Sequence, residues 1–92
     1  MTNVIITLKI MPESPEVDLT KLKEETLKLI KEFAGEGETK TEEKPIAFGL
    51  KSLDIIFIMD ESQGSTDSLE ESIKSISGVQ SVEVIDVRRA IG

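Results

Sequence analysis

Residues 44–59 read KPIAFGLKSLDIIFIM, a turn between a proline and a glycine that leads into the longest apolar run of the chain. Within this run, side chains alternate at the period of a strand. Leu53, Ile55, Phe57 and Met59 fall on one face, and Ile56 and Ile58 on the other. The pattern predicts a central strand over residues 50–59, covered on one side and partly sheltered on the second.

The turn before this strand carries an aromatic side chain between two backbone constraints. Pro45 fixes its own φ and favours an extended Lys44, whereas Gly49 gives the backbone freedom. Phe48 between them can be held rigidly and still face outward. Residue type alone favours a buried Phe48 that caps the core below the turn. Both positions of Phe48 therefore stay open at this point.

On the N-terminal side, a strand and a helix are expected. Residues 4–10 alternate as in a half-buried strand, and residues 11–16, with two prolines, are typical of a loop. Asp18 is a good N-cap for the helix. The helix has one apolar stripe, and Gly35 ends it. The stripe is formed by Leu19, Leu22, Thr26, Leu29, Ile30 and Phe33.

Residues 38–44 contain no apolar side chain, so periodicity does not choose between an edge strand and a solvated loop. Alternating charged residues and threonines favour an exposed edge strand, because native sheets protect their edges in this way.

On the C-terminal side, residues 60–65 form a turn-rich link to a second helix. Ser65 or Thr66 can cap this helix, and Gly78 is expected to end it. It presents Leu69, Ile73 and Ile76 to the core. The last strand, residues 81–87, changes phase after Val84. Either a bulge or shelter on both faces explains this change.

The expected order is therefore strand, helix, strand, strand, helix, strand, in one domain over residues 1–92. Two split βαβ units of this size form an α+β ferredoxin-like sandwich, a four-stranded antiparallel sheet with both helices on one face. This fold hosts many unrelated activities, so it does not determine function.

Composition excludes several classes of protein. The 92 residues contain no Cys, His, Tyr or Trp, which removes disulfides, thiolate metal sites and the commonest general base. A net charge of −7 argues against a grip on nucleic acid phosphates. No apolar stretch approaches a membrane span, and the start lacks a signal peptide. We expect a soluble intracellular protein, in which any chemistry would rest on carboxylates, lysines, arginines or hydroxyls.

Residues 60–71 have the length of a calcium loop with an acid at each end. Gly64 stands where a ligand belongs and Ser65 where glycine is needed, so the pattern fails at two diagnostic positions. A weak divalent site among Asp60, Glu61 and Asp67 is the minor alternative to a plain helix start.

Three segments together resemble the archaeal beta subunit of translation elongation factor one. They are residues 11–19, reading MPESPEVDL, residues 43–50, reading EKPIAFGL, and residues 84–89, reading VIDVRR. The resemblance runs from end to end of the chain. It implies a guanine nucleotide exchange factor for the GTPase that delivers aminoacyl-tRNA, elongation factor 1-alpha.

The resemblance also implies roles for two groups of residues. In the related eukaryotic domain an aromatic in a proline-to-glycine turn docks into the GTPase. This aromatic maps onto Phe48, with Pro45, Ile46 and Gly49 around it. A basic residue near the C-terminus reaches the magnesium and phosphate site, and it maps onto Arg89 with Arg88 as neighbour. The eukaryotic ending has a lysine instead. The resemblance implies a cytoplasmic exchange factor without bond chemistry of its own, so we expect no catalytic residue, cofactor, metal site or binding of free nucleotide.

Two rival functions from other classes remain. A nucleic acid binder of this fold needs aromatics on its sheet and a surplus of Lys and Arg, and this chain has neither. A small-molecule-binding regulatory domain is the remaining alternative. Stabilisation by an amino acid or nucleotide would support it. On composition alone, Arg88 and Arg89 are an ordinary solvated terminus.

Overall fold

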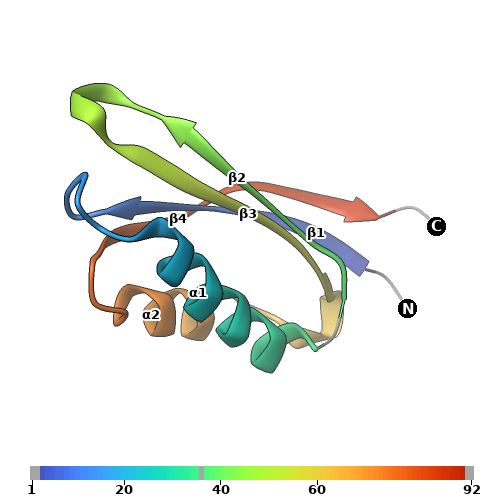
Figure 1. Cartoon of the computed structure of the whole chain (residues 1–92). Coiled ribbons are helices and arrows are strands. Elements are labelled where there is room, and N and C mark those ends of the chain that lie inside the picture. The colour runs from blue at the N-terminus through green and yellow to red at the C-terminus, as the bar shows by residue number, and fades with distance from the viewer. Residues whose placement is uncertain (1–2, 36, 91–92) are drawn as a thin grey trace.

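The computed structural model describes residues 3–35 and 37–90. The sheet has the strand order β2-β3-β1-β4, and every neighbouring pair is antiparallel. Both helices cover one face of the sheet (Figure 1). This is the predicted α+β ferredoxin-like fold. Its elements are β1 (Asn3–Pro12), α1 (Leu19–Ala34), β2 (Thr39–Pro45), β3 (Lys51–Asp60), α2 (Asp67–Lys74) and β4 (Val79–Ala90).

The core lies between the sheet and the helices, and the alternation in β1 and β3 builds its sheet side. Leu8 pairs across the strands with Ile55, and Ile6 with Phe57. All four side chains are buried. Each such burial contributes about 1.5–3 kcal/mol. The helices complete the core with Leu22, Thr26 and Ile30 from α1 and Leu69 and Ile73 from α2.

Both predicted ends of α1 are confirmed. The Asp18 carboxylate accepts hydrogen bonds from the backbone amides of Thr20 and Lys21 at 3.0 and 3.3 Å. The helix ends at Ala34, and Gly35 follows with φ of 82°. That left-handed conformation is open to glycine at little cost.

The edge strand favoured over residues 38–44 is also confirmed. β2 pairs only with β3 and lies at one margin of the sheet. Its side chains are exposed except Thr41, which is half-buried. The exposed lysines and glutamates on β2 protect this free edge.

The loop predicted from residue 11 onward begins later, because β1 continues through Pro12. Pro12 pairs with Val79 of β4 after a shift in register at Met11/Pro12. A proline is tolerated at an irregular strand end, since the regular ladder no longer needs its missing N–H there.

α2 is shorter than predicted and ends at Lys74 rather than next to Gly78. The amide of Ser75 donates to the carbonyls of both Glu71 and Ser72, and the Ile76 amide donates to Ile73. The chain therefore tightens into i to i+3 turns before β4. Ile76 still packs against the core from this turn.

The phase change in the last strand is a bulge. Leu8 pairs with Val84 but Thr7 pairs with Asp86, so Ile85 is an extra residue in β4. β4 itself spans more than the predicted residues 81–87. The bulge sets the faces of the strand end, because directly opposite residues share a face.

No helix within residues 3–35 and 37–90 is long and apolar enough to cross a membrane.

Candidate functional site

The β2–β3 hairpin reaches beyond the helices at one end of the molecule (Figure 1). Its tip is a tight turn over Ala47–Gly49. The Ile46 amide donates to the Leu50 carbonyl at 2.8 Å, and the Leu50 amide donates to Ala47 at 3.3 Å. These two bonds close the turn, while Ile46 and Leu50 are half-buried at its base.

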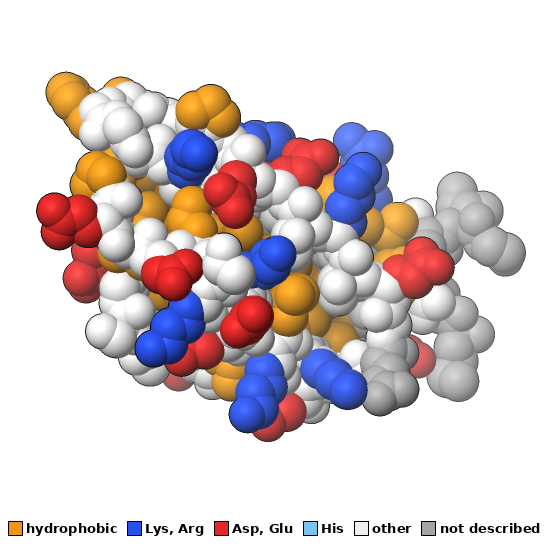
Figure 2. All heavy atoms as spheres, in the orientation of Figure 1, with side chains coloured by type: hydrophobic (Ala, Val, Ile, Leu, Met, Phe, Trp, Pro, Cys, Tyr) orange, Lys and Arg blue, Asp and Glu red, His pale blue; other side chains and the backbone are white. Residues whose placement is uncertain are grey.

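Phe48 stands at the top of this turn with its side chain in solvent. It is 94% exposed, which rules out the buried position that its residue type favours. Apolar atoms gather at the hairpin tip in Figure 2, at upper left. An exposed Phe forgoes about 1.5–3 kcal/mol of burial. The fold itself gains nothing from this placement.

The backbone at Phe48 is also unfavourable. Phe48 has φ of 62° and ψ of 31°, and it is the one non-glycine residue with positive φ in the described parts of the chain. The left-handed conformation costs a residue with a Cβ about 1–2 kcal/mol. Strained residues of this kind cluster where a structure displays a side chain for binding.

Gly49 follows Phe48 with φ of 75°, so two successive residues are left-handed. No heavy atom lies within 4 Å of the position of a Cβ on Gly49, so its backbone angle, and not space, requires glycine. Pro45 ends β2 opposite Lys51. At the tip, Pro45, Phe48 and Gly49 are exposed and Ile46 is half-buried.

Beside the tip lies a shallow cleft of about 340 Å³ between the hairpin and the segment from Pro12 to Thr20. Gly49, Glu43 and Lys51 line it from the hairpin. Val17 and Asp18 line it from the other side. The cleft is mostly polar, which suits the rim of a contact surface better than a pocket for an apolar ligand.

Arg88 and Arg89 lie on β4 and leave the sheet on opposite faces. Arg88 is opposite Ile5, on the face without helices, and its Nε lies 2.9 Å from Asp86 Oδ2. Arg89 is opposite Val4, on the helix side. Its Nη2 donates to Glu61 Oε1 at 2.9 Å.

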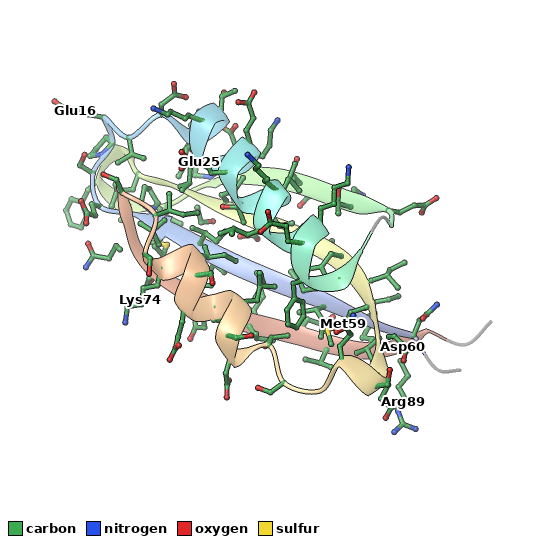
Figure 3. All side chains as sticks on the ribbon, turned by 90° about the horizontal axis from the view of Figure 1, so that it is seen from below. Glu16, Glu25, Met59, Asp60, Lys74 and Arg89 are labelled. Atoms are coloured by element: carbon green, nitrogen blue, oxygen red, sulfur yellow. The ribbon has the colours of Figure 1, made fainter. Side chains whose placement is uncertain are left out.

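Glu61 belongs to a short turn that follows β3. Asp60 caps this turn by accepting a hydrogen bond from the Ser62 amide at 2.8 Å. That bond and one from the Ser62 hydroxyl hold the pKa of Asp60 below its ordinary value. Asp60 and Arg89 lie close together at this end of the sheet (Figure 3).

The structure does not bring Phe48 and the two arginines together. Arg89 and Met59 both pair with Val4, whereas Pro45 pairs with Lys51. At about 3.3 Å per residue along β3, these two ends are about 26 Å apart before the turn is added. Figure 3 shows Arg89 and the loop with Glu16 at opposite ends of the molecule.

The sequence analysis did not identify the ion-pair contacts of two acidic residues, Glu61 and Asp54. Glu61 was considered only as a ligand of a weak divalent site, yet its carboxylate accepts a hydrogen bond from Arg89. Asp54 was given no role, although it is 4% exposed and paired with Lys44. An acid inside the longest apolar run was the available signal. Within residues 3–35 and 37–90, no three acidic side chains group closely enough to hold a metal ion.

Comparison with known proteins identifies the family of the chain. The sequence model of the EF-1 guanine nucleotide exchange domain matches residues 5–90. The chain belongs to this family of exchange domains.

Three relatives to which the chain is similar are named elongation factor 1-beta. The chain is 46% identical over 89 residues to elongation factor 1-beta of Methanothermobacter thermautotrophicus, covering 97% of this chain and 98% of that one. It is 48% identical over 92 residues to elongation factor 1-beta of Methanobrevibacter smithii, with the same coverage. Elongation factor 1-beta of Sulfolobus acidocaldarius is 44% identical over 88 residues, covering 95% of this chain and 96% of that one.

Similarity to solved structures supports the fold alone. The designed protein Foldit4 matches with a TM-score of 0.63 at 19% identity, over 98% of both chains. BlrP1 BLUF matches with a TM-score of 0.57 at 14% identity, over all of this chain and 57% of that one.

Proposed function

We propose that this protein promotes release of GDP from the translation elongation GTPase, elongation factor 1-alpha, so that GTP can rebind. The observation that carries the proposal is Phe48, an aromatic side chain displayed in solvent by a strained turn at the tip of a projecting hairpin. Membership of the exchange-domain family supports a GTPase as the partner that Phe48 contacts.

Phe48 acts as the anchor in this proposal. A rigid aromatic side chain that enters an apolar pocket buries much area at little entropic cost. Pro45, Ile46 and Gly49 form the surface around it and contact the GTPase with it. The turn is closed by its own backbone bonds, so little ordering remains to be done on binding.

Arg89, with Arg88 beside it, acts at the other end. A GTPase holds GDP largely through its magnesium ion and the phosphates. A cation brought to that site competes with the magnesium for the phosphate charge and weakens the hold on the nucleotide. With the extents of the molecule at 42 × 21 × 18 Å, anchor and cations contact separate parts of the GTPase.

Exchange then follows from differential binding. The protein must bind the nucleotide-free GTPase more tightly than the GDP-bound form, and by linkage GDP must weaken its binding by the same factor. No covalent bond is made or broken by this chain, so it needs no catalytic residue, cofactor or metal of its own. The whole chain acts as one exchange domain, without binding free nucleotide, nucleic acid or membrane.

Release of a fluorescent GDP from the purified GTPase tests the proposal. The rate should rise with the concentration of this protein and then saturate. A well-folded protein that leaves the release rate unchanged at every concentration contradicts it. A thermal shift by an amino acid or free nucleotide would then favour the regulatory-domain alternative.

A further inference from the structure

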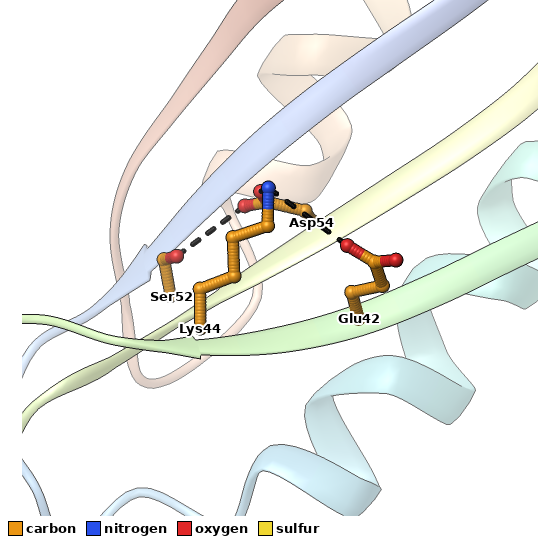
Figure 4. A network of polar contacts seen from close by, with 4 residues as sticks. All are labelled: Glu42, Lys44, Ser52 and Asp54. Atoms are coloured by element: carbon orange, nitrogen blue, oxygen red, sulfur yellow. Dashed lines mark hydrogen bonds and ion pairs between the residues drawn. The ribbon is translucent and has the colours of Figure 1, made fainter.

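The described part of the chain contains one buried carboxylate, that of Asp54, and it lies on the face of the sheet without helices. Asp54 Oδ2 lies 3.2 Å from Lys44 Nζ, and the Ser52 hydroxyl donates to Asp54 Oδ1 at 3.3 Å. Lys44 Nζ also lies 3.8 Å from Glu42 Oε2 (Figure 4). The pair links the edge strand β2 to β3.

The register explains why Lys44 is needed there. Glu42 is directly opposite Asp54, and like charges at opposite positions push two strands apart. Lys44 is opposite Ser52 and reaches diagonally to Asp54, so its ammonium lies between the two carboxylates. Its charge offsets their repulsion.

This contact is next to the turn that displays Phe48. Lys44 precedes Pro45, which has no N–H to give to the ladder. Among the described strands, β2 is hydrogen-bonded only to β3, so beyond Lys44 the hairpin depends on that pairing. Lys44 is therefore the last residue of β2 before the turn that has both a backbone N–H and a backbone carbonyl. Its side-chain contact with Asp54 holds this residue in place.

A stabilising role alone does not account for this pair. Its Asp54 carboxylate is buried, whereas the Lys44 side chain is 58% exposed. Burying a carboxylate costs free energy that the attraction of a partly solvated partner returns only in part, and apolar replacements are often at least as stable. An ion pair can also fix the orientation of the neighbouring Pro45–Gly49 turn. Apolar side chains do this less well, because their contacts are not directional.

We propose that Asp54, through Lys44, is a positioning residue that holds the Pro45–Gly49 turn in the orientation in which Phe48 docks. The inference rests on the proposed function for its effect on exchange. Its structural part, the order of the turn, can be measured without any partner.

The variant set separates positioning from general stability. Asp54→Asn and Lys44→Met each break the pair. Lys44→Arg keeps the positive charge, so the order of the turn should remain as in wild type. Glu42→Gln is the matched control, since it removes the more distant and more exposed carboxylate from the same lysine. The double variant Lys44→Met, Asp54→Leu replaces the pair by apolar side chains and should keep the melting temperature. Circular dichroism checks the fold of each.

The first readout is hydrogen exchange of the Ile46 amide, which closes the turn onto Leu50. It should become faster in Asp54→Asn, in Lys44→Met and in the apolar double variant, but not in Glu42→Gln or Lys44→Arg. Unchanged Ile46 exchange in all of them overturns the inference, even if the protein has no effect on GDP release.

The second readout is GDP release. Asp54→Asn should raise the half-saturating concentration on the order of tenfold and leave the maximal rate unchanged. When Asp54→Asn is added to Phe48→Ala, the half-saturating concentration should not rise further. If Asp54 had only a structural role, Asp54→Asn would raise it by the same factor with and without Phe48. If wild type and Phe48→Ala behave as the proposed function requires but Asp54→Asn matches Glu42→Gln, only the inference fails. Failure of wild type itself contradicts the proposed function instead.

Discussion

Arg89 on β4 donates from Nη2 to Glu61 Oε1 at 2.9 Å, which joins the end of the last strand to the turn after β3. Both side chains are exposed, and such pairs contribute about 0–1 kcal/mol. The contact orients Arg89 without making it structurally necessary. Its neighbour Arg88 is exposed in the same way and pairs with Asp86.

Arg89→Ala should therefore lower the maximal rate of GDP release while leaving the free energy of unfolding within about 1 kcal/mol of wild type. Urea denaturation measures the second quantity. Arg88→Ala, measured in the same way, decides which of the two arginines acts, because the two side chains leave opposite faces of the sheet. Equal maximal rates for Arg89→Ala and wild type would remove Arg89 from the exchange step.

The strain at Phe48 predicts a difference between two small replacements. Phe48→Gly should be more stable than Phe48→Ala by about 1 kcal/mol, because only glycine adopts φ of 62° without penalty. Both variants should bind the GTPase equally weakly, because both lack the aromatic side chain. Urea denaturation compares the two variants. A large loss of stability in both would instead mean that Phe48 packs in the core.

The fold was predictable where one physical signal dominated. Alternation through Leu53 to Met59 defined the central strand, and Asp18 and Gly35 defined the ends of α1. The signals failed where tertiary pairing decides. Pro12 stays in β1 because the register shifts beside it, and α2 ends early because its last amides change partners.

The candidate site was only partly predictable. The turn at Pro45–Gly49 was located from its proline and glycine. Residue type alone favoured a buried Phe48, whereas the family resemblance implied a docking and therefore outward-facing Phe48, and the structure shows the side chain exposed. The role of Asp54 depends on side chains from β2 that reach over it. No local pattern in β3 contains that information.

Thr26 gives a stability prediction inside α1. Its hydroxyl is fully buried and has no hydrogen-bond partner among the described residues. Thr26→Val keeps the branched shape and removes the unpaired oxygen, so it should stabilise the protein by about 1 kcal/mol. Urea denaturation measures the change, with Thr20→Val on the exposed side of the same helix as control. Destabilisation by Thr26→Val would mean that the hydroxyl is satisfied in solution.

Leu8 and Ile55 test the predicted core. They pair across β1 and β3 and are fully buried. Leu8→Ala or Ile55→Ala should each lower the free energy of unfolding by about 2–5 kcal/mol. Val87→Ala, at an exposed position of β4, should change it by less than about 0.5 kcal/mol. Similar losses at all three positions would contradict the assignment of the core.

The most direct test of the central claim compares wild type with Phe48→Ala in the release of fluorescent GDP, over a full concentration series, with folding checked by circular dichroism. If Phe48 is the anchor, the variant should need on the order of tenfold to a hundredfold more protein for half-saturation, because an anchor residue contributes about 2 kcal/mol or more. It should still approach the wild-type maximal rate. A Phe48→Ala curve that overlays that of wild type would contradict the account.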